Sequence, residues 1–148
     1  MKAARLVEYR KPLELVEVDV PEVGRHGALV EIVACGVCHT DLHLQDGSMK
    51  RGRLPITLGH EMAGEVAEVG EEADWLRKGT RVLVDYHYTC GRCRNCRMEL
   101  EEECLDPTSG GFDVDGGYAE YAWAPARNLI ELPEGVSYEE GATLACGG

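Results

Sequence analysis

Alternating apolar and polar positions recur along the chain in segments of four to eight residues, which is the pattern of half-buried β-strands. Glycine and proline residues separate these segments and indicate turns. The expected strands cover residues 3–8, 13–20, 28–35, 59–70, 81–85, 118–125 and 128–132. Glycines within segment 59–70 suggest a bend or bulge there. The pattern therefore predicts a mainly β fold, a barrel or sandwich of short strands.

Two segments favour short helices instead. Residues 38–46 are polar and form either a short helix, from about Cys38 to Leu44, or an irregular turn. Ser137-Tyr-Glu-Glu140 has the capping-box pattern that starts a helix, and Cys146 would lie at the end of that helix. Residues 86–112 read as an inserted lobe. We thus expect residues 1–148 to form one domain with a few short helices and this lobe.

Charge and hydropathy exclude several classes of partner. The chain has 27 acidic and 15 basic side chains among 148 residues, a net charge of −12. Nucleic acids and anionic membranes are held mainly by Lys and Arg, so neither is an expected partner. No apolar run approaches the roughly 20 residues of a membrane helix. The N-terminus lacks the apolar core of a signal peptide, so we expect a cytoplasmic protein.

Four of the seven cysteines form one local cluster with the spacing C-x2-C-x2-C-x7-C. A zinc ion takes about four thiolates in a tetrahedron, and two-residue gaps allow tight turns around one ion. The sequence therefore predicts a structural zinc site at Cys90, Cys93, Cys96 and Cys104. Four reduced cysteines, or two disulfides, are the alternatives.

The other three cysteines leave more than one interpretation open. Cys35 and Cys38 have the spacing of a redox pair, but Cys35 lies in an apolar strand and suits a small buried residue better. Residues 38–43 place a thiol, two imidazoles, a hydroxyl and a carboxylate close together. His60 stands beside Glu61 between glycines, although a lone histidine is more often structural. Spacing alone cannot join these residues to Cys146.

Five motifs occur in a familiar order: ACGVCHTDLH, LPITLGHEMAGEVAEVG, the CGRCRNC loop, DGGYAEYAWAP and ATLACGG. Together they resemble the zinc-dependent medium-chain alcohol dehydrogenases, particularly bacterial and archaeal members. The resemblance spans essentially the whole chain. It implies a GroES-like β-barrel catalytic domain with an inserted structural-zinc lobe.

The resemblance also implies a role for each matching residue. A catalytic zinc would be held by Cys38, His60 and Cys146 with one open position, and Glu61 would lie beside it. Thr40 and His43 match a proton relay, and Asp41 matches a carboxylate that orients His60. His39 lies where the family contacts the pyrophosphate of the cofactor. Capping of the helix start is the alternative for Thr40 and Asp41.

The implied reaction is reversible oxidation of a primary or secondary alcohol to an aldehyde or ketone, with hydride transfer to NAD(P). Residues 46–50 depart from the family because they lack a pocket tryptophan, so the size of the substrate is open. The chain also contains no G-x-G-x-x-G fingerprint. We therefore expect a piece of a homo-oligomeric dehydrogenase that is inactive without a Rossmann domain. A zinc-stabilised module without catalysis is the alternative.

Overall fold

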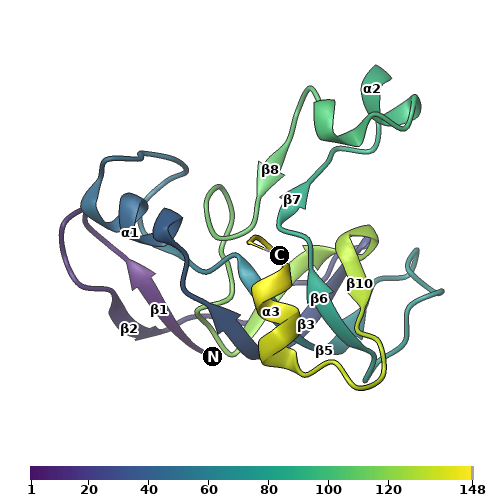
Figure 1. Ribbon diagram of the computed structural model, residues 1–148, viewed down its shortest axis with the longest axis horizontal. Helices are drawn as coiled ribbons and strands as arrows, with labels where there is room; N and C mark the ends of the chain where they lie inside the picture. The colour runs from purple at the N-terminus through teal and green to yellow at the C-terminus, as the bar shows by residue number, and fades with distance from the viewer. Residues whose placement is uncertain (148) are drawn as a thin grey trace.

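The computed structural model describes residues 1–147 and is mainly β, as the sequence predicts (Figure 1). The longer strands are β1 (Lys2–Leu6), β2 (Glu14–Glu17), β3 (Gly27–Gly36), β5 (Glu61–Val69), β6 (Arg81–Val84), β9 (Tyr121–Pro125) and β10 (Leu129–Glu131). Short strands are β4 (Ile56–Thr57), β7 (His87–Tyr88) and β8 (Thr108–Ser109). The helices are α1 (His39–Asp46), α2 (Arg94–Arg97), α3 (Tyr138–Leu144) and the 3-10 turns η1 (Glu101–Glu103) and η2 (Ala126–Asn128).

Three antiparallel sheets organise the strands. The largest has the order β10-β6-β5-β3-β9, and a second has the order β2-β1-β4. Strands β7 and β8 pair only with each other and lead to the projecting segment that carries α2 (Figure 1). The register of β3 against β5 shifts twice, after Leu29 and after Ile32, which fits the irregularity expected for a glycine-containing strand.

The main core lies on one face of the large sheet. Side chains alternate along each strand, so that Met62 and Val66 of β5 join Val82 and Val84 of β6 in this core. Residues between them face the other way, where Ala63 packs with Leu132 and Ala142 of α3. A second core holds Leu6, Leu44, Ile56, Leu58 and Phe112 between the small sheet and α1.

Both predicted helices form, and in each an acidic side chain of the first turn accepts a hydrogen bond from the backbone of the N-cap residue. Ser137 accepts a hydrogen bond from the backbone of Glu140 at 3.2 Å, and the Glu140 carboxylate accepts from Ser137 N at 2.9 Å, which is the expected capping box. Helix α1 ends at Asp46, the last residue of the polar segment 38–46, so this segment is a helix and not an irregular turn. Its C-cap is Gly47, whose φ of 77° is left-handed. With a length of eight residues, α1 is the longest helix of residues 1–147, and none of these helices is long and apolar enough to cross a membrane.

Several strand boundaries differ from the sequence prediction. The segment 13–20 forms a strand only over Glu14–Glu17, and 118–125 forms one only from Tyr121. Asn128, the first residue of the last expected strand, belongs to η2, and β10 begins at Leu129. Strands β4, β7 and β8 were not expected, because pairs of two residues are too short to show an apolar alternation.

Close packing between β5 and β3 leaves no room for a side chain at Gly64. A Cβ atom there would overlap the backbone oxygen of Glu31 and contact Val30. We expect Gly64→Val to lower the free energy of unfolding by about 1–3 kcal/mol, the usual cost of overpacking. The exposed Glu68 of the same strand supplies the control, since Glu68→Val should change stability by less than about 0.5 kcal/mol. Urea denaturation of both variants measures the difference; equal stabilities would contradict the packing account.

Candidate metal centres

The first candidate centre lies in the projecting segment between β7 and β8. One sulfur atom from each of four cysteines lies within 4.8 Å of the others: Cys90, Cys93, Cys96 and Cys104. The sulfurs of Cys93 and Cys96 lie 3.4 Å apart, and those of Cys90 and Cys96 lie 3.9 Å apart. A tetrahedral zinc ion with Zn–S bonds of about 2.3 Å has S···S edges of about 3.8 Å. The sulfur positions therefore suit one tetrahedral ion.

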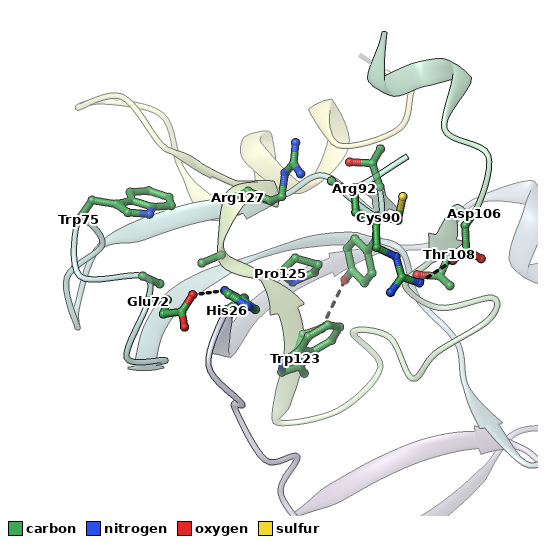
Figure 2. A pocket seen from close by; sticks show the side chains of 15 residues that line it. His26, Glu72, Trp75, Cys90, Arg92, Asp106, Thr108, Trp123, Pro125 and Arg127 are labelled. Carbon is green, nitrogen blue, oxygen red and sulfur yellow. Dashed lines mark hydrogen bonds and ion pairs between the residues drawn. The ribbon is translucent and has the colours of Figure 1, made fainter. Parts of the chain in front are cut away.

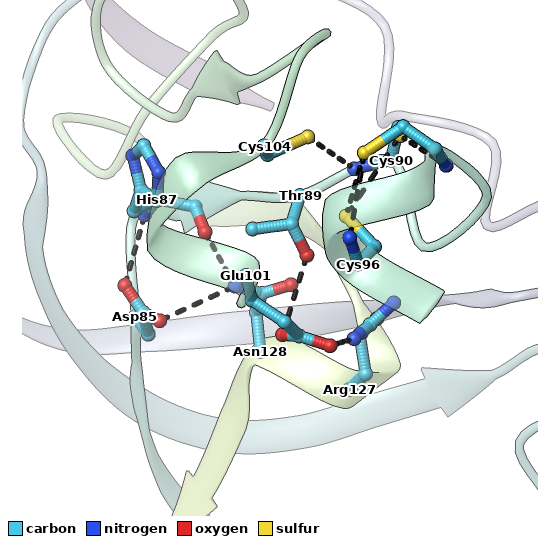
Figure 3. A network of polar contacts seen from close by, with 10 residues as sticks. Asp85, His87, Thr89, Cys90, Cys96, Glu101, Cys104, Arg127 and Asn128 are labelled. Carbon is cyan, nitrogen blue, oxygen red and sulfur yellow. Dashed lines mark hydrogen bonds and ion pairs between the residues drawn. The ribbon is translucent and has the colours of Figure 1, made fainter. Parts of the chain in front are cut away.

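Backbone amides donate to these sulfurs and stabilise negative charge on them (Figure 3). Cys90 N donates to the sulfur of Cys104 at 3.3 Å, and Cys93 N donates to the sulfur of Cys90 at 3.4 Å. Backbone donors, chiefly the N–H of Leu105, lower the pKa of Cys93 to about 6. Burial instead raises the pKa of Cys96 to about 11. A cation at the centre of the cluster would favour the thiolate at all four positions.

The second candidate centre gathers residues from three distant parts of the chain. Ligand atoms of Cys38, His60, Glu61 and Cys146 all lie within 4.8 Å of one another. Cys38 precedes α1, His60 and Glu61 lie at the start of β5, and Cys146 follows α3. The contacts of α3 with β3 and β5 bring the last ligand into place. The fold thus assembles a set that spacing could not join.

His60 is the residue that most needs a partner. Its side chain is fully buried, and neither ring nitrogen has a hydrogen-bond partner among the described residues. Nδ1 lies 3.6 Å from Oδ1 of Asp41, so Nε2 is the nitrogen left for another ligand. A buried polar atom without a partner is costly, and a metal ion bound to Nε2 would remove that cost. The donor set of two thiolates and one imidazole is a known zinc combination.

Asp41 holds this centre together by three contacts. Its carboxylate accepts hydrogen bonds from Cys38 N at 3.0 Å and from Gly59 N at 3.1 Å, and it faces Nδ1 of His60. Burial opposes the charged form of Asp41, but its neighbours, His60 first, lower its pKa overall. Burial likewise opposes the charged form of His60, whose pKa is nevertheless raised by Asp41 and Cys38. Asp41 therefore caps the start of α1 through Cys38 N, and its carboxylate also faces the imidazole of His60.

The remaining predicted site residues lie along α1. The hydroxyl oxygen of Thr40 is 3.6 Å from the sulfur of Cys38, and the Thr40 side chain makes no cap of the helix. His43 is exposed one helical turn further on, and its Nδ1 lies 3.3 Å from the hydroxyl of Ser48. His39 is exposed, with its ring centroid 6.2 Å from that of His43. The helix thus runs from the buried ligand to the surface.

All seven cysteines are free thiols, so the structure contains neither of the disulfides that the sequence left open. Cys35 lies outside both clusters, against Gly59 and Gly117. Burial raises the pKa of its thiol to about 12, which disfavours the reactive thiolate. The redox interpretation of Cys35 and Cys38 is therefore not supported by the environment of Cys35.

Two aromatic rings next to His60 complete the second centre. The Tyr86 ring meets the imidazole in a T-shaped contact at 5.0 Å, and the Phe112 ring lies 4.5 Å from it, between ring centroids. Phe112 was missed from the sequence. One feature of the sequence could have drawn attention to it: Phe112 is the only phenylalanine of the chain, and it follows two glycines, Gly110 and Gly111.

A surface pocket lies elsewhere. It has a volume of about 770 Å³ and lies between η2, the loop that carries Trp75 and the four-cysteine segment (Figure 2). Its charged side chains are paired within the chain, as in His26 with Glu72 and Arg92 with Asp106. It contains Cys90 but no ligand of the second centre, so the candidate chemistry does not belong to it.

The known proteins that resemble this chain include alcohol dehydrogenases and an L-threonine 3-dehydrogenase. The chain is 41% identical over 150 residues to an alcohol dehydrogenase of Geobacillus stearothermophilus, covering 100% of this chain and 44% of the relative. It is 40% identical over 134 residues to an L-threonine 3-dehydrogenase of Pyrococcus abyssi, covering 88% of this chain and 38% of the relative. A cobalt- and zinc-bound alcohol dehydrogenase of Pyrobaculum aerophilum superposes with a TM-score of 0.90 at 32% identity, covering 99% of this chain and 45% of that structure.

The chain therefore spans less than half the length of these relatives. The family model that describes the alcohol dehydrogenase GroES-like domain matches residues 24–134, well over half of the chain. The motifs, the mainly β fold and the two ligand clusters agree with that match. The chain belongs to the alcohol dehydrogenase GroES-like domain family.

Proposed function

We propose that this chain is the zinc-binding catalytic part of an NAD(P)-dependent alcohol dehydrogenase. The reaction would be the reversible oxidation of a primary or secondary alcohol to an aldehyde or ketone. The convergence of Cys38, His60 and Cys146 around one point is the observation that carries the proposal. The four-cysteine cluster would hold a second, structural zinc ion.

The donor set explains why this centre suits the chemistry. Two thiolates balance the charge of a zinc ion, and three protein ligands leave a fourth position for substrate. Zinc in such a site acts as a Lewis acid and lowers the pKa of a hydroxyl group. Glu61, whose carboxylate lies within 4.8 Å of the other ligand atoms, would take a position at the metal while substrate or water exchanges.

The proton that the substrate hydroxyl loses must leave a partly buried site. Thr40 is half-buried beside Cys38, and exposed His43 lies one helical turn away. We assign Thr40 as the hydroxyl that would accept this proton while it gives up its own. His43 would be the imidazole that receives a proton through the ribose of the cofactor and passes it to solvent. Asp41 would keep His60 in the orientation that directs Nε2 to the metal.

The nicotinamide cofactor would be shared with the rest of a longer protein. The alcohol dehydrogenase of Geobacillus stearothermophilus is more than twice the aligned length, since this chain covers 44% of it. Exposed His39 at the start of α1 is the residue that we assign to the pyrophosphate. The 148-residue chain by itself would bind metal without turning over alcohol.

Two further possibilities have specific support. The relationship to an L-threonine 3-dehydrogenase makes a secondary alcohol within an amino acid a candidate substrate. A metal-stabilised module without catalysis is the candidate from a different class, because the four-cysteine cluster is built from a local segment and does not depend on the second centre. The number of zinc ions bound per chain distinguishes the module from the dehydrogenase.

We expect the purified chain to bind about two zinc ions, one in the four-cysteine cluster and one at the second centre. Cys38→Ser and Cys96→Ser should each reduce this number to about one, because each removes one thiolate from one centre. Elemental analysis after removal of loosely bound metal gives the count. Cys96→Ser should also make residues 86–112 sensitive to protease, since metal binding energy there is folding energy. If the chain binds one zinc ion and Cys38→Ser does not change that number, the dehydrogenase proposal is contradicted and the metal-stabilised module without catalysis remains.

In the full-length protein, Cys38→Ser should abolish turnover because it weakens the Lewis acid. His43→Ala should lower kcat by only about 10- to 100-fold, at the low end of acid–base effects, because water can replace an exposed imidazole. Gln45→Ala on the same helix is the control and should leave kcat near the unsubstituted value. Steady-state kinetics with a primary and a secondary alcohol measure these effects. A His43→Ala variant with unchanged kcat would remove this residue from the relay.

A further inference from the structure

Strands β7 and β8 form a two-stranded ribbon that joins the two candidate metal centres. His87 pairs with Ser109 and Tyr88 pairs with Thr108, and these two strands have no other partner strand among the described residues. At the base of the ribbon, Gly110 N donates to the carbonyl of Tyr86 at 3.0 Å. The ribbon therefore has a defined register at the end that lies next to His60.

The other end of the ribbon is closed by the four-cysteine cluster. Cys90 follows β7 by two residues, and Cys104 precedes β8 by four. Cys90 N donates to the sulfur of Cys104 at 3.3 Å, which joins the outgoing and returning chains directly (Figure 3). A metal ion bound by both residues would fix the separation of the two strands.

Each strand of the ribbon delivers one aromatic ring to His60. Tyr86 immediately precedes β7, and Phe112 follows β8 by three residues. Their ring centroids lie 5.0 Å and 4.5 Å from the imidazole and 5.5 Å from each other. Phe112 is only 5% exposed. Neither nitrogen of His60 has a hydrogen bond within residues 1–147, so these rings and the carboxylate of Asp41 help to restrain the imidazole.

The turn after β8 fixes Phe112 to the ribbon. Ser109 N donates to the carboxylate of Asp113 at 2.9 Å, and Asp113 N donates to the carbonyl of Ser109 at the same distance. Arg51 forms an ion pair with Asp113 at 2.9 Å and donates to the hydroxyl of Ser109 at 3.3 Å. The ring of Phe112 therefore follows the position of β8, and β8 depends on β7 and Cys104.

We propose that the four-cysteine cluster positions the second metal centre through this ribbon, with Phe112 as the positioning residue that contacts His60. The cluster would then be more than a stabiliser of its own segment, because its loss would release β8 and loosen the packing on the imidazole. This inference rests on the proposed function, since it requires that the second centre binds metal. The four-cysteine cluster and Phe112 would thus affect metal binding at the second centre although they contribute no ligand to it.

Metal affinity at the second centre is the direct readout. The chain would be loaded with Co²⁺, and the thiolate-to-cobalt absorption would be followed during competition with a chelator, with Cys38→Ser identifying the signal of the second centre. We expect Phe112→Leu to weaken this binding about 10-fold, within the range of about 10–100-fold for groups that support metal ligands. Cys104→Ser should weaken it to a similar extent, although Cys104 belongs to the other centre.

The double variant and a matched control decide whether the ribbon carries the effect. If Cys104 acts through Phe112, the double variant should lose less affinity than the product of the two single losses. Met98→Ala, at a position 66% exposed within the four-cysteine segment, should leave the affinity unchanged. Unchanged cobalt affinity in Cys104→Ser, or losses that multiply in the double variant, would overturn the proposal.

Circular dichroism shows whether Cys104→Ser is folded, and a second variant is decisive if it is not. In that case Phe112→Leu, which preserves an apolar side chain of similar size, decides the proposal, and unchanged cobalt affinity in this variant would overturn it. A wild-type chain that shows no cobalt signal sensitive to Cys38→Ser would instead remove the proposed function, and this inference with it. The two failures are therefore distinguishable.

Discussion

The buried imidazole of His60 is the constraint on which the rest of the site depends. A ring that is closed to bulk solvent and has no hydrogen bond on either nitrogen from the described residues is costly in a protein interior, so its surroundings have to supply a compensating partner. The carboxylate of Asp41 faces one nitrogen at 3.6 Å. The sulfurs of Cys38 and Cys146 lie with the imidazole around a common point. A bound cation would satisfy all of these groups at once.

The fold meets this constraint by bringing three segments to one end of the large sheet. Strand β3 leads into α1, which presents Cys38 and Asp41, and the antiparallel neighbour β5 begins next to His60. Helix α3 packs across β3, β5 and β6 and so delivers Cys146. The β7–β8 ribbon is a fourth segment. Tyr86 and Phe112, which flank its two strands, place their aromatic rings against His60. The hydrogen-bonded strands β3 and β5 thus supply the rigidity that the ligands need.

Local patterns in the sequence were sufficient for some features and not for others. The capping box at Ser137 and the spacing of Cys90, Cys93, Cys96 and Cys104 involve near neighbours, and both predictions agree with the geometry. Cys146 is 108 residues from Cys38, and only the resemblance to a family joined them before the structure was known. Phe112 was missed because its contact with His60 depends on the register of β8, a strand too short to show a pattern.

Anomalous scattering at the zinc edge from crystals of the zinc-loaded chain tests the central claim most directly. The account predicts two peaks. One would lie within the four-cysteine cluster, and the other would lie about 2.0–2.1 Å from Nε2 of His60 and about 2.3 Å from the sulfur of Cys38. A single peak confined to the four-cysteine cluster would contradict the account, because the buried imidazole would then have no metal partner.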